Sequence, residues 1–363
     1  MLERENTFAA IWEEYETVKL APAVRLAAVV LVAFGAVACG SSSKSTSGTT
    51  AAKKSGGYKV GLVTDVGGLN DHGFNQLSYQ GLKRAENQLG VQGTVLVSKS
   101  SADYVPSLAS LARKGNKLVI AVGFLMTDAV ATVAKQFPGT KFAIIDVDAT
   151  TLAGKPKNVE GLIFREQQGG YLVGYLAGLV TKHKGGKQVV GVVGGDPIPP
   201  VNRFAAGFEA GARAADPGVK TLLTYSNDFV AQPKCKELAL NEIAAGAQVV
   251  FADAGGCGLG VHDAAREKNV WSIGGDADQS YLGPEILTSE LKKVDVAVMD
   301  AIKGAMTGKF TGGGNLVFTA QNGGIGVGKI SPKVPQSIVA QEKAELAKMA
   351  AGKIRNIPTT PTK

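Results

Sequence analysis

From Tyr58 onward the chain alternates short apolar runs rich in β-branched residues with amphipathic stretches. The runs predict strands at 58–64, 94–97, 117–122, 141–146 and 159–164, and then a second series at 188–193, 220–225, 247–252 and 270–274. The stretches between them predict helices over 73–89, 104–115, 127–136, 167–183, 202–215, 232–245 and 259–268. Strands of this kind, separated by helices, are typical of α/β proteins whose parallel sheets are covered on both faces. Because the series occurs twice, we expect two successive doubly wound lobes.

Most of the expected strands end in glycine or aspartate. The segments are VTDVGG (63–68), VGF (122–124), IIDVD (144–148), VVGGD (192–196), ADAGGCG (252–258) and IGGDAD (273–278). In doubly wound folds, ligands bind in the crevice at the carboxyl ends of the strands. Glycine lets a backbone approach a ligand closely, and aspartate accepts hydrogen bonds from hydroxyl groups. The sequence therefore predicts a cleft for a polar small molecule.

The first 57 residues carry the pattern of an export signal. Residues 26–38 form an uncharged run of 13 residues, too short to cross a bilayer, which takes about 20. Basic residues precede the run, and Ala36-Val37-Ala38 lead directly to Cys39, as in a bacterial lipobox. We predict a signal peptide over 1–38, a lipid on the Cys39 thiol and a flexible tether over 39–57. The alternative is a buried apolar helix with an incidental cysteine.

Residues 1–17 fit this signal poorly, because five glutamates are wrong for its basic beginning. We therefore expect translation to start near Val18. Removal of residues 1–38 leaves 36 basic and 26 acidic residues, spread along the chain without a basic block. This distribution predicts ordinary surface charge and no nucleic-acid partner.

Motifs for cofactors, metals and catalysis are missing from the sequence. GGCGLG at 255–260 lacks the spacing of a dinucleotide-binding loop, and the chain has no G-x-x-x-x-G-K-[ST], G-x-S-x-G or H-E-x-x-H. His72, His183 and His262 lie far apart without the spacing of metal ligands. Paired acids such as Asp146 and Asp148 do not make an acid/base pair by spacing alone. We expect no cofactor, no metal and no enzymatic activity.

A collinear set of motifs carries a family resemblance. VTDVGGLNDHGFNQ (63–76) leads into GLKRAENQLGV, and the later segments are GFLMTDAV (123–130), FAIID (142–146), FREQQGGYLVGYLAG (164–178), FAAGFEAG (204–211), AGGCGLG (254–260), GGDADQ (274–279) and LTSELKKVDVAV (287–298). Over about residues 58–355 the chain resembles the basic membrane lipoprotein family, the nucleoside-binding lipoproteins of bacterial ABC importers.

The resemblance implies a type I periplasmic-binding-protein fold, with two doubly wound lobes joined by a three-segment hinge. We expect the crossovers near 164–166, 287–290 and 313–317. The first lobe would then comprise 58–164 plus 289–314, and the second 165–288 plus 315–355, with 356–363 as a tail.

The resemblance also implies a set of ligand-binding residues. Phe74 and Phe229, one from each lobe, would sandwich an aromatic base, which suits the large flat surface of a purine. Asn75 and Asp128 would contact the base edge, and Asp276 and Lys292 the ribose hydroxyls. Asp71 would line the mouth or cap the helix that follows, and Gly256 would approach the ligand through its backbone. Phe124 and Met126 are candidates for either cleft wall or core.

Together these features predict a monomeric, non-enzymatic receptor, lipid-anchored at the outer face of the cytoplasmic membrane in the cell envelope. It would close on a nucleoside, with purine nucleosides favoured, and deliver it to a permease driven by an ATPase.

The sequence has Phe229-Val230-Ala231 where the family has a polar element, so a sugar or polyol ligand remains an alternative. A nucleoside-cleaving enzyme is a further alternative. A sugar-responsive regulator would need an N-terminal DNA-binding segment, where this chain has an export signal.

Two cysteines remain once Cys39 is lipidated. Exported proteins favour disulfides, and an even remainder fits one bridge. Cys235 begins a predicted helix and Cys257 follows the neighbouring predicted strand, so both should lie at the cleft end of the second lobe. We predict a Cys235–Cys257 disulfide, with two free buried thiols as the alternative.

Overall fold

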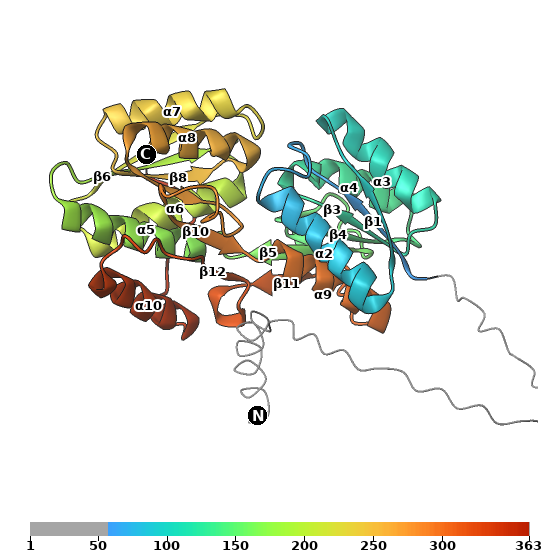
Figure 1. The fold of residues 1–363 in the computed structure, drawn as a ribbon. Coiled ribbons are helices and arrows are strands. Elements are labelled where there is room, and N and C mark those ends of the chain that lie inside the picture. Colours follow the sequence, from blue (N-terminus) through green and yellow to red (C-terminus); the bar gives the residue numbers. More distant parts are fainter. Residues whose placement is uncertain (1–56, 363) are drawn as a thin grey trace, which may run out of the picture. The chain divides into compact units, whose positions relative to one another are not determined.

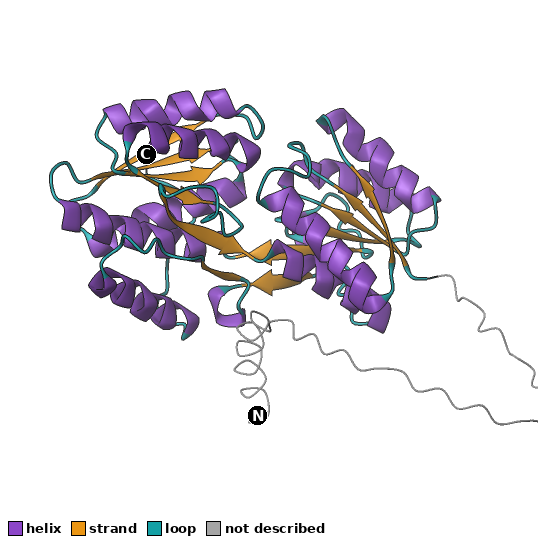
Figure 2. Cartoon of the chain, in the orientation of Figure 1, coloured by secondary structure: helices purple, strands orange, loops and turns teal. Residues whose placement is uncertain are grey.

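The computed structural model describes residues 57–362, which form two six-stranded sheets with their covering helices (Figure 1). The predicted signal peptide, Cys39 and the tether up to residue 56 lie outside the described residues. The predicted fold class is confirmed: both sheets are dominated by parallel strands, and helices cover both faces of each (Figure 2).

The first sheet is parallel throughout, in the order β11-β5-β4-β3-β1-β2. Its strands are β1 (Lys59–Val63), β2 (Gln92–Leu96), β3 (Leu118–Ala121), β4 (Lys141–Ile145), β5 (Val159–Phe164) and β11 (Asn315–Phe318). Two helix pairs cover it, α2 (Phe74–Leu89) with α9 (Val294–Thr307), and α3 (Tyr104–Arg113) with α4 (Thr127–Gln136).

The second sheet has the order β12-β10-β9-β8-β6-β7, with only β12 antiparallel to its neighbour. Its strands are β6 (Val189–Gly194), β7 (Lys220–Tyr225), β8 (Val249–Asp253), β9 (Trp271–Gly274), β10 (Ile286–Lys292) and β12 (Ile325–Val327). Its helices are α5 (Glu166–Lys184), α6 (Pro199–Ala215), α7 (Gln232–Ala244), α8 (Leu259–Lys268) and α10 (Gln336–Ala350), which packs on α5. Short 3₁₀ turns lie at Ser101–Asp103, Phe124–Met126, Ala149–Thr151, Gly255–Gly258 and Ala320–Asn322.

Strand side chains alternate between two cores in each lobe. In β3, Leu118 and Ile120 pack with the core that includes α2 and α9, whereas Val119 and Ala121 pack with the core of α3 and α4. All four side chains are fully buried. Burial on both faces explains why these strands are apolar throughout, because neither face meets water.

Glycines bring α5 and α6 unusually close together. A Cβ added to Gly170 or Gly174 of α5 would lie 2.1 or 2.2 Å from the carbonyl oxygens of Phe204 and Phe208 in α6. Real Cβ atoms do not approach an oxygen so closely. The two glycine-rich motifs, FREQQGGYLVGYLAG and FAAGFEAG, are therefore the two sides of one helix–helix contact.

The crossovers between the sheets differ from the expected positions in two places. The first follows β5, as expected. The second follows Lys292, because β10 continues beyond 287–290 and pairs with β9 and β12. The third follows Phe318, because 315–318 forms β11 and pairs with β5 of the first sheet. Residues 289–292 thus belong to the second sheet and 315–318 to the first.

Cys235 of α7 and Cys257 form a disulfide in the structure, with their Cα atoms 5.6 Å apart. Both residues are fully buried. The bridge ties α7, which follows the Phe229 loop, to the Gly255–Gly258 turn. Within residues 57–362, none of the helices has the length and apolar character needed to cross a membrane.

Candidate functional site

A cleft lies where loops of both sheets meet at the carboxyl ends of their strands, the position expected for a ligand in a doubly wound fold. The first sheet contributes Asp65, Val66, Asp71, Phe74, Asn75, Gly123, Phe124 and Asp146. The second contributes Ile198, Pro200, Val201, Phe204, Phe229, Asp253, Gly255, Gly256, Asp276 and Lys292.

Asp71 holds the first turn of α2. Its Oδ1 accepts hydrogen bonds from the backbone N–H groups of Gly73 and Gln76, both at 3.1 Å, and its Oδ2 accepts from Asn75 N–H at 2.7 Å. The carboxylate is buried, and a negative charge beside free N–H groups stabilises a helix start. Of the two roles expected for Asp71, the contacts describe the cap. This cap fixes the position of Phe74 at the edge of the cleft.

Asn75 joins α2 to the loop after β1. Its Oδ1 accepts from Asp65 N–H at 2.9 Å, and its Nδ2 donates to the carbonyl of Val66 at 3.2 Å. Both ends of the amide are therefore bonded to backbone. Asp65 is the nearby carboxylate that faces the cleft: a Cβ added to Gly123 would lie 2.6 Å from its Oδ2. Burial raises the pKa of Asp65 to about 6.

The two phenylalanines each lie against a glycine. A Cβ added to Gly123, after β3, would be 3.2 Å from the ring of Phe74. A Cβ added to Gly195, after β6, would be 2.2 Å from the ring of Phe229. Both rings are partly exposed and line the cleft. The two lobes thus offer one aromatic ring each, and a strand-end glycine makes room for each ring.

Lys292 is the cation of the cleft, at the end of β10. Its Nζ lies 2.7 Å from the carboxylate of Asp146, which follows β4 of the other sheet, and 3.2 Å from Oε1 of Glu166. The rings of Phe74, Phe164 and Phe204 surround it at 5.0–5.6 Å. Burial alone would lower the pKa of Lys292, but the carboxylates outweigh it and the pKa is raised. Lys292 is therefore a permanent positive charge that links the two lobes.

Acidic side chains dominate the rest of the lining. Asp65, Asp71, Asp146, Asp253 and Asp276 face a single lysine. Burial raises the pKa of Asp276 to about 6 and that of Asp253 well above its ordinary value. The backbone of Asp276 is left-handed, with φ of 63°, and its Oδ2 points toward Gly73 of the other lobe. Such a cleft suits a ligand that presents several hydrogen-bond donors.

Most of the residues expected at the site come together, and one does not. Asp71, Phe74, Asn75, Phe229, Gly256, Asp276 and Lys292 line the cleft, whereas Asp128 is exposed in the first turn of α4 and is not part of the lining. A contact between Asp128 and the ligand therefore stays a prediction, which the position of Asp128 outside the lining does not support. Phe124 is wall, and Met126 is core.

Several lining residues were not singled out from the sequence. Asp65, Asp146 and Asp253 lie at or just after the ends of β1, β4 and β8, so the glycine and aspartate pattern at strand ends is the signal that points to them. Phe204 carried no such signal. Among residues 57–362, no cluster of three or more His, Cys, Asp or Glu is placed to hold a metal ion.

Comparison with known proteins places these features in context. The family described as "ABC transporter substrate-binding protein PnrA-like" matches residues 58–359. The chain is 34% identical to the CD4+ T-cell-stimulating antigen of Listeria monocytogenes, over 93% of this chain and 98% of that protein. It is 33% identical to the ABC transporter nucleoside-binding protein BmpA of Lactococcus lactis, over 84% and 91%. A solved ABC transporter solute-binding protein from Aeropyrum pernix superposes with a TM-score of 0.74 at 27% identity, covering 83% of this chain and 93% of that one.

Proposed function

Since the chain belongs to the family of PnrA-like ABC transporter substrate-binding proteins, we propose that it captures nucleosides outside the cytoplasm and delivers them to an ABC importer. Purine nucleosides are the favoured ligands. The protein itself would catalyse no reaction, and its partners would be a membrane permease and the ATPase that drives it. The name of the Lactococcus lactis relative supports a nucleoside.

The observation that carries the proposal is the pairing of Phe74 and Phe229 across the cleft. Each ring lies against a strand-end glycine of its own lobe and faces the same cavity. A nucleobase stacks on aromatic faces with about 1–3 kcal/mol per base. Two lobes that each supply a ring can enclose both faces of a base when they close.

The carboxylates suit the rest of a nucleoside. Ribose hydroxyls and base N–H groups are donors, and the five aspartates of the lining are acceptors. The ionised aspartates oppose a phosphate group, and Lys292 is already paired with Asp146 and Glu166. We therefore expect nucleosides to bind and their 5′-monophosphates to be rejected.

The N-terminal pattern supports a membrane-anchored location. The run at 26–38 followed by Cys39 is the signal and lipidation site of a lipoprotein, and a tether of this length would let the receptor reach a permease. Mass spectrometry of the membrane fraction tests this part: a diacylated mature N-terminus at Cys39 is expected. An unmodified Cys39 would contradict the anchor.

A ligand panel tests the proposed specificity. The purified domain 57–363 is titrated by calorimetry with inosine, guanosine, adenosine, uridine, adenine, ribose, arabinose and inosine 5′-monophosphate. Purine nucleosides should bind most tightly, and the free base and sugars weakly. Ligand at 100 times its Kd stabilises a protein by about 2.7 kcal/mol, so thermal shifts provide a second readout. Tight binding of a sugar without any nucleoside binding would overturn the proposal.

The same samples address the enzyme alternative. After overnight incubation with the protein, inosine is analysed by chromatography for free hypoxanthine. We expect none above the level without protein. Release of base that scales with protein concentration would show a nucleoside-cleaving enzyme.

A further inference from the structure

A chain of side-chain hydrogen bonds connects the interior of the second lobe to the ligand-binding loop of the first. His262 of α8 lies within 3.0 Å of Ser272 Oγ through Nδ1, and within 2.8 Å of Gln279 Oε1 through Nε2. Gln279 Nε2 in turn donates to the backbone carbonyl of His72 at 3.0 Å. His72 belongs to the first lobe, directly before the Gly73–Phe74 start of α2.

The hydrogen-bond partners fix the direction of the chain. Gln279 Nε2 faces the carbonyls of His72 and Gly275, so it must be the amide nitrogen and not the oxygen. Oε1 therefore accepts from His262, and Nε2 of the ring carries the proton. Nδ1 is left to accept from the Ser272 hydroxyl. Burial lowers the pKa of His262, which keeps this neutral form of the ring.

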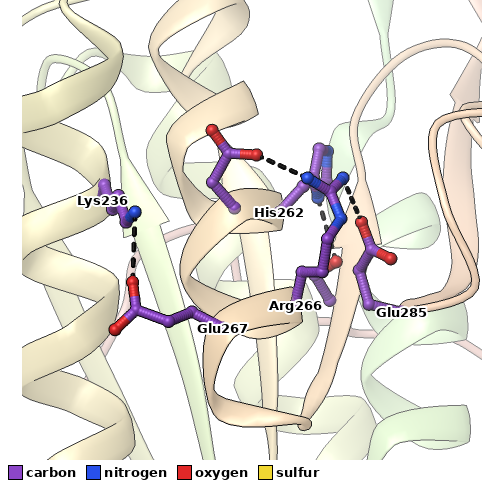
Figure 3. Close-up of polar contacts among 7 residues, drawn as sticks. Lys236, His262, Arg266, Glu267 and Glu285 are labelled. Carbon is purple, nitrogen blue, oxygen red and sulfur yellow. Dashed lines mark hydrogen bonds and ion pairs between the residues drawn. The ribbon is translucent and has the colours of Figure 1, made fainter.

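Gln279 is rigidly held on the second lobe. Its backbone N–H donates to Ser289 Oγ at 2.9 Å, and its side chain is almost fully buried. A Cβ added to Gly274 would lie 2.4 Å from its Oε1, so the GGDADQ segment leaves room for this amide. Figure 3 shows His262 on the same helix as Arg266, whose guanidinium pairs with Glu285 at 2.5 Å. The contacts of Gln279 with His262 and Ser289 orient its amide toward the first lobe.

The loop of the first lobe that contacts Gln279 has an unusual backbone conformation at His72. His72 has a φ of 56°, which is uncommon for a residue with a side chain. This conformation presents the His72 carbonyl to Gln279. On the exposed rim, the His72 ring also contacts the hydroxyl of Tyr281 at 2.7 Å. Asp71 and Phe74 flank the contact on the same loop, so whatever holds His72 also places the cleft-lining residues beside it.

We infer that Gln279, oriented by His262 and Ser272, is a latch that holds the 71–75 loop of the first lobe against the second lobe and so slows the release of a bound ligand. Gln279 would thus be a positioning residue, acting on ligand retention through the loop of Phe74. The inference rests on the proposed function for its ligand, but the contact itself involves only residues of this chain.

The variant Gln279→Glu tests the contact of residue 279 with His72 separately from its contact with His262. The new side chain has nearly the same shape and can still accept from His262, but it offers an oxygen to the His72 carbonyl instead of a donor. Tyr281→Phe is the matched control, because it removes the other contact to His72 at the exposed rim. Gln279→Met serves if the carboxylate prevents folding.

Stopped-flow kinetics with inosine should show dissociation about tenfold or more faster for Gln279→Glu, since a buried carbonyl loses its partner. Association should change little, because such contacts act mainly on dissociation. Tyr281→Phe should stay within about twofold of the parent. Deuterium exchange of the ligand-free protein should be faster in residues 66–76 of Gln279→Glu only.

The outcomes are separable from those of the proposed function. If the parent binds no nucleoside, the proposed function fails, and the exchange of residues 66–76 still tests the latch. If the parent binds inosine but Gln279→Glu and Gln279→Met keep its dissociation rate and exchange, the latch is wrong. Equal effects of Tyr281→Phe and Gln279→Glu would also overturn it, because the buried amide would then have no special part.

Discussion

Phe74 and Phe229 each lie against a glycine at the end of a strand of their own lobe. Phe74→Ala and Phe229→Ala should each weaken nucleoside binding by about 1–3 kcal/mol, the value of one base–aromatic stack. Both variants should unfold at nearly the parent temperature, because the rings are partly exposed cleft residues. Calorimetry and thermal melts measure the two effects. Parent-like affinity in both variants would refute the aromatic sandwich.

Asp276 allows a sharper test on the sugar. Its left-handed backbone disfavours alanine, and asparagine tolerates this conformation, so Asp276→Asn is the suitable change. If Asp276 accepts from the ribose 2′-hydroxyl, the variant should lose about 1–3 kcal/mol for inosine. The loss should be smaller for 2′-deoxyinosine, which lacks that donor. Equal losses for the two ligands would show that Asp276 does not contact the 2′-hydroxyl.

The sequence predicted individual site residues through motif position, and the structure brings most of these residues to one cleft. Phe74, Phe229 and Asp276 follow strand ends, so the fold carries them to the cleft. Motif position could not show which contacts each side chain makes in the folded protein. The side-chain amide of Asn75 is hydrogen-bonded to the backbone of Asp65 and Val66, and the side chain of Asp128 is exposed. Hydrogen-bond partners distant in the chain decide such roles.

The contact between α5 and α6 depends on having no side chain at its closest points. Gly174→Ala would place a Cβ 2.2 Å from the carbonyl oxygen of Phe208, so the helices must separate. We expect a loss of about 1–3 kcal/mol in the free energy of unfolding, the usual cost of overpacking. Gly139→Ala is the control, because nothing lies within 4 Å of its added Cβ. Urea denaturation compares the two, and equal stabilities would contradict the tight contact.

The disulfide gives a prediction about the second lobe alone. The Cα separation of 5.6 Å is within the normal range for a bridge, and the enclosed loop spans 22 residues. In the chain-entropy model, the disulfide should raise the free energy of unfolding by about 3 kcal/mol relative to the reduced protein. Alkylation without reductant, followed by intact-mass analysis of the unlipidated domain, should add no alkyl group. Two added groups would show that the thiols are free in the isolated protein.

Among the elements, the sequence identified those with long, regular patterns. The run at 159–164 and the helix at 127–136 have the bounds that the sequence predicted. It missed β10, β11 and β12 as strands, because ILTSELK mixes polar and apolar residues and the other two are only three or four residues long. Their pairing partners, not their own composition, make them strands. The positions of the second and third crossovers could therefore not be predicted before the pairing of these strands was known.

The stability of the whole molecule should depend on pH through an acid buried in the second lobe. Glu242 of α7 is almost fully buried, and its Oε1 accepts from Thr224 at 2.8 Å. Its Oε2 has no hydrogen-bond partner among the described residues. A Cβ added to Gly191 would lie 2.0 Å from this oxygen. Burial, opposed by the Thr224 bond, raises the pKa of Glu242 to about 8.

A raised carboxyl pKa means that the folded protein holds a proton which the unfolded chain has already released. The free energy of unfolding therefore falls as the pH rises from 4.5, the ordinary pKa of a glutamate, toward 8. The fall is up to about 1.4 kcal/mol per pH unit. Below that window the contribution of Glu242 is fully present, and above it the loss is complete. The variant Glu242→Gln, which resembles the protonated acid, should lack this part of the slope.

Urea denaturation of parent and Glu242→Gln at pH 5, 6.5, 8 and 9 measures the difference. The stability of the variant relative to the parent should rise between pH 5 and 8 and then level off. Other buried acids, such as Glu290 and Asp253, are present in both proteins, so their titration cancels in the comparison. A difference that stays constant across the four pH values would show that Glu242 is ionised in the folded protein throughout, and that water or a rearranged neighbour reaches its free oxygen.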